Sequence, residues 1–67
     1  MIHVTINGKQ TEIDGPMTVQ AYLDSKGLGG RQLAVAVNGA VLRRDEFATT
    51  SVKYGDRMEI VRPVGGG

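Results

Sequence analysis

Two Asn-Gly pairs, Asn7-Gly8 and Asn38-Gly39, constrain the fold of this chain more than any other feature of its sequence. Asparagine followed by glycine tolerates the positive φ angles of a type I′ turn, which folds one strand tightly back onto the next. Each pair follows a stretch in which larger hydrophobic residues alternate with other residues, the pattern of a strand with one buried face. We therefore expect two β-hairpins, one over residues 2–13 and one over residues 32–42.

A short helix is expected between the two hairpins. Thr18 can cap its N-terminus, the helix then covers residues 19–26, and Gly27 provides a left-handed stop. Spacings of three and four residues place three apolar side chains on one face, which can cover a sheet: Val19, Tyr22 and Leu23.

A last strand is expected over residues 57–62, with Pro63 ending it. The order of hairpin, helix, second hairpin and last strand is that of a ubiquitin-like β-grasp domain, an α+β fold in which one main helix packs on a mixed sheet of four to five strands. A split barrel without a packed helix is the alternative. We predict a β-grasp domain over residues 1–62 and a flexible Gly-rich tail over residues 63–67, and we expect the core to include Val41, Phe47, Met58 and Ile60.

The side chains offer little chemistry. The chain has no cysteine and one histidine, and its acidic residues are scattered, so we predict no catalytic residue and no metal site. His3 is expected to face solvent, and the adjacent Asp45 and Glu46 are expected to form a solvated turn. Eight basic residues against seven acidic ones are too balanced for nonspecific nucleic-acid binding. No apolar run approaches the roughly 20 residues of a membrane span and no secretory signal is recognisable, so we expect a cytoplasmic protein.

The C-terminal residues Gly65, Gly66 and Gly67 are the remaining candidates for function. Glycines at a chain end add nothing to a core and are costly to order, so the run is expected to be flexible. A frayed end and a working tail are both compatible with this composition. Because glycine has no side chain to obstruct a narrow channel, a working tail could carry the Gly67 carboxylate into the active site of another enzyme.

The chain resembles the ThiS family, the sulfur-carrier proteins of thiamine biosynthesis, across nearly its whole length. The resemblance rests on blocks whose order and spacing match: the first strand with its Asn-Gly turn, Thr18-Val19 with Leu23, residues 34–39, residues 55–61 and the terminal residues 64–67. Arg43 stands where the family often has proline, and Phe47 where it often has tryptophan. The small subunit of molybdopterin synthase, MoaD, shares the fold and the Gly-Gly terminus but is usually longer.

The resemblance implies that the chain is a sulfur-carrying substrate of other enzymes and is itself no enzyme. An E1-like adenylyltransferase of the ThiF type would use ATP and magnesium to adenylate the carboxylate of Gly67, and a cysteine desulfurase relay would then supply sulfur to form a thiocarboxylate. A thiazole synthase of the ThiG type would receive that sulfur. No cofactor would be bound by the carrier. A molybdopterin-type carrier, a ubiquitin-like protein modifier and a plain binding module with an inert tail are the alternatives.

Charged residues near the expected tail are candidate partner contacts, while a purely solvating role is the competing interpretation. Gly65 and Gly66 would thread the tail. The candidate contacts are Arg43, Arg44, Arg57, Glu59, Arg62 and Val64.

Overall fold

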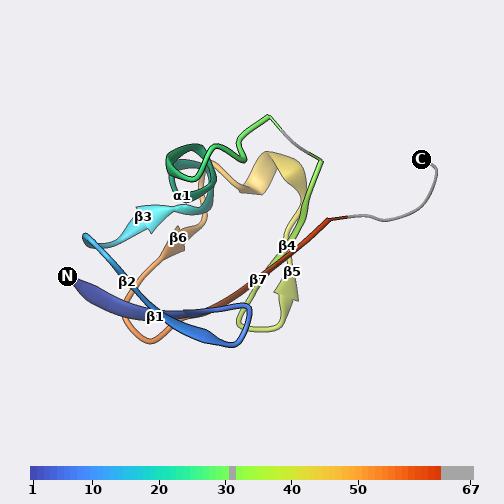
Figure 1. Ribbon diagram of the computed structural model, residues 1–67. Coiled ribbons are helices and arrows are strands. Elements are labelled where there is room, and N and C mark those ends of the chain that lie inside the picture. The colour runs from blue at the N-terminus through green and yellow to red at the C-terminus, as the bar shows by residue number, and fades with distance from the viewer. Residues whose placement is uncertain (31, 63–67) are drawn as a thin grey trace.

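The computed structural model describes residues 1–30 and 32–62, and its main sheet has five strands (Figure 1). Along the chain these strands are β1 (Ile2–Ile6), β2 (Lys9–Ile13), β4 (Ala34–Val37), β5 (Ala40–Val41) and β7 (Arg57–Val61). Their order in space is β2-β1-β7-β4-β5. Only β1 and β7 run parallel; the other neighbours are antiparallel. The sheet is therefore mixed, and the first strand of the chain lies beside the last.

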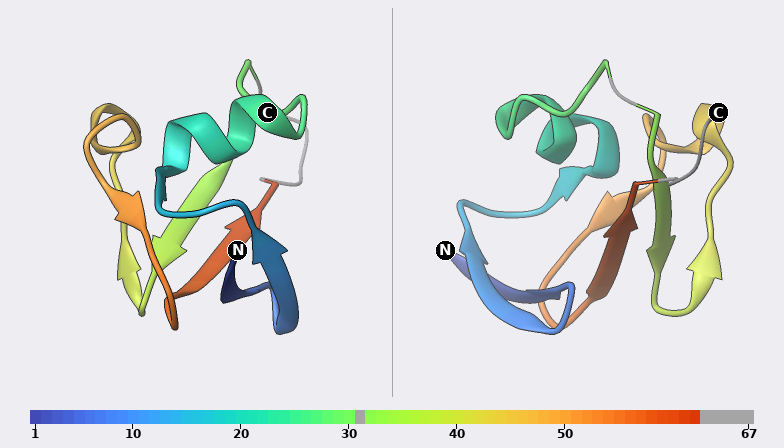
Figure 2. Two further views of the ribbon diagram at one scale, coloured as in Figure 1. Left: turned by 90° about the vertical axis from the view of Figure 1, so that its left-hand side faces the viewer. Right: turned by 45° about the vertical axis from the view of Figure 1, so that its right-hand side comes forward.

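Helix α1 (Val19–Ser25) packs across one face of this sheet (Figure 2). The hydroxyl oxygen of Thr18 accepts a hydrogen bond from the Ala21 N–H at 3.1 Å, and the helix ends one residue earlier than predicted, with Lys26 as its C-cap. Gly27 follows with a φ of 72°, in the left-handed region that stops a helix. The β-grasp arrangement predicted from the sequence, with one main helix on a mixed sheet, is confirmed.

Both predicted Asn-Gly turns are present. Asn7 and Asn38 each have a φ of 52°, and their glycines have φ angles of 81° and 86°. Ile6 pairs with Lys9 across the first turn and Val37 with Ala40 across the second, so each hairpin has a two-residue loop.

Three short elements were not predicted. β3 (Met17–Thr18) and β6 (Ser51–Val52) form a separate two-stranded sheet, and the 3₁₀ helix η1 covers Arg44–Glu46. Elements of two or three residues are too short to show a period in the sequence. The pairing of these two segments extends to the first residue of α1, because the Val19 N–H donates to the carbonyl oxygen of Thr50 at 2.9 Å.

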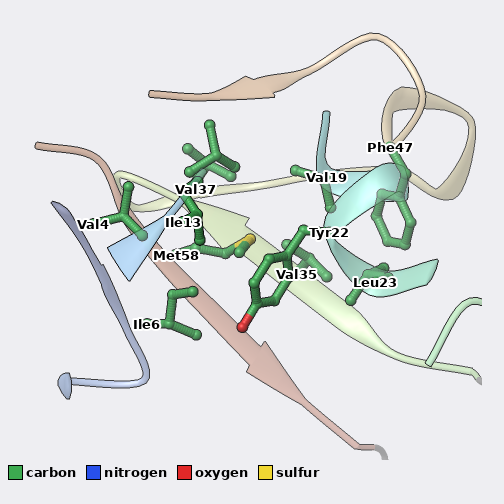
Figure 3. Packing of buried hydrophobic residues seen from close by; sticks show 11 residues of the cluster. Val4, Ile6, Ile13, Val19, Tyr22, Leu23, Val35, Val37, Phe47 and Met58 are labelled. Carbon is green, nitrogen blue, oxygen red and sulfur yellow. The ribbon is translucent and has the colours of Figure 1, made fainter. Parts of the chain in front are cut away.

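The core lies between α1 and the sheet (Figure 3). It includes the predicted helix face and the inward residues of β1, β4 and β7; its least exposed large side chains are Leu23, Met58, Val4, Val19, Val35 and Val52. Phe47 is buried as expected, and Ile60 packs at the edge of the core.

The prediction that Val41 belongs to the core is wrong, because its side chain is 76% exposed. The register explains the difference. Val41 pairs directly with Ala36, and directly opposed residues project from the same face of a sheet. Ala36 alternates with the buried Val35 and Val37, so Ala36 and Val41 both face away from the core. Leu42, the next residue, packs against the core instead.

Candidate functional site

The candidate site is built around the C-terminal end of β7, which leads to the glycine tail. The predicted tail lies outside the described residues; it comprises Pro63, Val64, Gly65, Gly66 and Gly67. The structure therefore defines the strand that precedes the tail and the surfaces on either side of it.

The C-terminal half of β7 is held from both sides. On the β1 side, the side-chain oxygen of Asn7 accepts a hydrogen bond from the Ile60 N–H at 2.8 Å, and the Asn7 N–H donates to the Met58 carbonyl oxygen at 3.0 Å. On the other side, β4 pairs with β7 as far as Val61, which lies opposite Ala34. The last described residues of the chain thus leave the sheet from a fixed position.

The N-terminal end of β7 is held by the second turn asparagine. The side-chain oxygen of Asn38 accepts from the Arg57 N–H at 2.9 Å, and its amide group donates to Asp56 at 3.1 Å. The other oxygen of Asp56 accepts from the Lys53 N–H at 2.9 Å. Burial alone would raise the pKa of Asp56, but these two hydrogen bonds and the nearby Lys53 ammonium group together lower it.

Sequence reasoning missed this second role of the two asparagines. It treated them only as residues that tolerate positive φ, whereas each side chain also accepts a backbone N–H of β7. The sequence contained no signal for this role, because the β7 residues involved are 19 and 53 positions away.

An apolar groove lies on the sheet face opposite α1, beside the end of β7. We call it the outer-face groove; its lining residues are Asn7, Ala34, Val35, Ala36, Val41, Glu59 and Val61. Ala34 and Ala36 have small side chains, while Val41 and Val61 are 76% and 57% exposed. Small residues between larger exposed ones form a shallow site that an apolar side chain of another protein can fill.

The predicted contact residues do not form one cluster. Arg57 and Glu59 both point outward from β7. Arg57 begins that strand, whereas Arg62 follows its end. Arg57 was expected near the tail but lies at the opposite end of β7 from the root of the tail. Arg43 and Arg44 lie at η1, where the Arg43 guanidinium forms a 2.8 Å ion pair with Asp45. Both arginines are exposed.

The remaining candidates for chemistry have local partners. His3 is exposed, as predicted, and its Nε2 lies 3.3 Å from a carboxylate oxygen of Glu12. Within residues 1–30 and 32–62, no three histidine or acidic side chains converge on a possible metal position. No helix in the same part of the chain is long and apolar enough to cross a membrane.

Comparisons with known proteins agree with this geometry. The model of the ThiS family matches residues 4–67. The crystal structure of the thiamine biosynthesis protein ThiS from Geobacter metallireducens superimposes with a TM-score of 0.86 at 35% identity, covering 98% of this chain and 100% of that one. A solution structure of a thiamine biosynthesis protein from Geobacter metallireducens gives a TM-score of 0.79 at 35% identity, covering 98% of this chain and 88% of that one.

Two curated relatives differ in length. A thiazole synthase of Paramagnetospirillum magneticum is 36% identical over 64 residues, which are 96% of this chain but only 20% of the relative. This chain therefore spans about one fifth of that relative. An uncharacterized protein of Porphyra purpurea is 29% identical over 66 residues, covering 98% of this chain and 93% of the relative.

Proposed function

The chain belongs to the ThiS family, and from this premise we propose that the carboxylate of Gly67 carries sulfur as a thiocarboxylate. The observation that supports this most strongly is the extent of the family match, which runs from residue 4 through the terminal glycines to residue 67. A role as a sulfur carrier is common to this family, and the thiocarboxylate at Gly67 is the specific form that we infer.

The chemistry requires activation, because a carboxylate oxygen is a poor leaving group. An adenylyltransferase of the ThiF type would transfer AMP from magnesium-bound ATP to the Gly67 carboxylate and release pyrophosphate. A persulfide from a cysteine desulfurase relay would then displace AMP. Release of the thiocarboxylate requires a thiol to cleave the resulting S–S bond, and since this chain has no cysteine, that thiol must come from a partner.

We place the sulfur transfer in thiazole formation for thiamine. The relative named thiazole synthase contains a region similar to this whole chain, which favours a thiazole synthase of the ThiG type as the enzyme that receives the sulfur. In this proposal the carrier supplies only the reacting group, and its partners supply catalysis. Because activation consumes ATP, we place the reaction in the cytoplasm.

The body of the domain would serve as a recognition surface. We assign contact with the adenylyltransferase to the outer-face groove, with the outward Glu59 and Arg57 on the same strand. Arg44 is exposed and forms no ion pair within residues 1–30 and 32–62, whereas Arg43 pairs with Asp45, so Arg44 is the better candidate of those two. Gly65 and Gly66 would thread the tail, and Val64 would contact the partner at its entrance.

Mass spectrometry of the intact chain tests the proposal. Incubation with the adenylyltransferase, magnesium-ATP and a sulfur source should add about 16 Da, as one oxygen is replaced by sulfur. Deletion of Gly67 should abolish this gain, because the shortened tail falls short by one residue, about 3.5 Å when extended.

A Gly30→Ala variant is the control, because this glycine does not have a φ in the left-handed region and has open space around its Cβ position. It should gain the mass as the wild type does. A Gly67-deleted chain that still gained about 16 Da, or a wild-type chain that became linked to lysine amines of other proteins, would contradict the proposal.

A further inference from the structure

A second hollow lies on the α1 side of the sheet, where the core is open beside the end of β7. We call it the tail-root hollow; its lining residues are Ile6, Asn7, Tyr22, Lys26, Leu28, Leu33, Ile60 and Arg62. Ile6 and Tyr22 are buried core residues, whereas Leu28, Leu33 and Ile60 are only half-buried. Figure 3 shows the Tyr22 hydroxyl directed toward Ile6. Aliphatic side chains thus reach the surface next to the root of the tail.

The charged side chains that line this hollow are both basic. Lys26 and Arg62 are exposed, no described lining residue is acidic, and neither cation forms an ion pair within residues 1–30 and 32–62. The Lys26 ammonium lies 5.8 Å from the centre of the Tyr22 ring, over the ring. Burial raises the pKa of Tyr22, so its hydroxyl stays neutral and adds no negative charge.

The outer-face groove has the opposite character. Its only charged lining residue among those described is Glu59. The two surfaces flank the same strand on opposite faces of the sheet. Because one is lined by an acidic residue and the other by basic residues, they suit partner surfaces of different charge. The tail-root hollow complements an apolar side chain surrounded by carboxylates.

We propose that the tail-root hollow binds a surface of thiazole synthase in which carboxylates surround an apolar side chain. This inference rests on the proposed function. Arg62 lines the hollow and is the last described residue before the tail, so an enzyme that takes in the tail must cover this surface. Thiazole synthase is chosen as the occupant because a protein of that name includes a region like this chain. Docking here would hold the carrier while the tail enters the active site.

Charge reversal tests the proposal with purified thiazole synthase. The Lys26→Glu/Arg62→Glu variant should bind about tenfold more weakly by calorimetry at low salt, because two attractive pairs become repulsive. Raising the salt concentration should weaken wild-type binding and reduce the difference in affinity between the wild type and the double variant. Lys26→Glu alone should show part of the loss. Lys9→Glu is the matched control, because Lys9 is an exposed lysine outside both surfaces, and it should bind as the wild type does.

The outcomes separate this proposal from the proposed function. Folding of each variant is checked by circular dichroism, and a folded double variant that bound thiazole synthase as tightly as the wild type would overturn the docking site. So would a wild-type chain that dimerised through this surface and still bound the enzyme as tightly as the monomer does, because the hollow would then be covered. A wild-type chain that showed the charge-dependent binding but gained no mass with the adenylyltransferase would support the docking site and overturn the carrier chemistry.

Discussion

At the scale of single residues, Asp56 is the buried charged side chain within the described part of the chain. It joins two turns, because one oxygen accepts from the Asn38 amide and the other from the Lys53 N–H. A buried carboxylate is tolerated only when its oxygens are paired in this way. Asp56 therefore links the second hairpin to the start of β7.

The lowered pKa of Asp56 predicts acid sensitivity. Its carboxyl group has a pKa of about 3.9 in the unfolded chain and a lower one in the folded protein, so the unfolded state binds a proton first as pH falls. The stability from Asp56 is complete above about pH 4 and is lost as pH falls through the folded pKa. Urea unfolding of the wild type between pH 6 and about pH 2 should show this loss.

The Asp56→Asn variant isolates the contribution. Asparagine replaces one carboxylate oxygen with an NH₂ group, which would face one of the two N–H donors that Asp56 accepts from. The variant should therefore lose about 1–3 kcal/mol of unfolding free energy at pH 7. It should also lose less stability on acidification than the wild type. Asp14→Asn, at an exposed site, is the control. Equal acid sensitivity in Asp56→Asn and wild type would show that Asp56 is not the group responsible.

At the scale of elements, the first hairpin does more than pair β1 with β2. Its turn residue Asn7 also fastens β7, the strand that leads to the tail. The parallel strands β1 and β7 pair through Thr5 with Arg57 and Ile6 with Met58, both in the first half of β7, so this side-chain bond extends the contact toward the tail. The hairpin turn thus helps to set where the tail begins.

Asn7→Gly tests this extension. Glycine accepts the positive φ without strain but cannot accept the Ile60 N–H, so the unfolding free energy should fall by about 1 kcal/mol. Hydrogen exchange should accelerate most at the Ile60 amide. Asn7→Asp keeps an acceptor oxygen and should retain protection there. If Ile60 stayed fully protected in Asn7→Gly, the side-chain bond would have no role in holding the strand.

At the scale of the whole molecule, one small core leaves both faces of β7 available for partners. α1 covers the inner face except at the tail-root hollow, and the outer face carries the outer-face groove. The two surfaces end at the same place, beside the root of the tail. A carrier that meets two enzymes in turn can therefore offer each a differently charged surface while presenting one tail.

Val41→Lys separates recognition from folding at this scale. Because Val41 is 76% exposed, the change should alter the unfolding free energy by less than about 0.5 kcal/mol. It should raise the KM for the carrier in the adenylation assay severalfold and leave kcat unchanged, since only docking is weakened. Tyr54→Lys, at a residue 73% exposed and outside the groove, should leave KM unchanged. An unaltered KM in Val41→Lys would remove the outer-face groove from the contact with the adenylyltransferase.

Most of the fold predictions that the structure confirms were based on local sequence signals. The Asn-Gly turns, the Thr18 cap, the Gly27 stop and the alternation in β1, β4 and β7 depend on residues within a few positions of one another, and all are confirmed. The family resemblance pointed to the tail by the same kind of short-range pattern. By itself the sequence therefore determined the two hairpins, the helix and the fold class, while the role of Gly67 stays a prediction.

Tertiary structure alone decided how distant segments meet. The pairing of Ala36 with Val41 turned Val41 out of the core, and the parallel pairing of β1 with β7 brought Asn7 to Ile60. Packing of α1 on the sheet brought Lys26 and Arg62 to one hollow. The physical reason is that alternation specifies which residues of a strand share a face, whereas register and strand order specify which face is buried and which neighbour it meets.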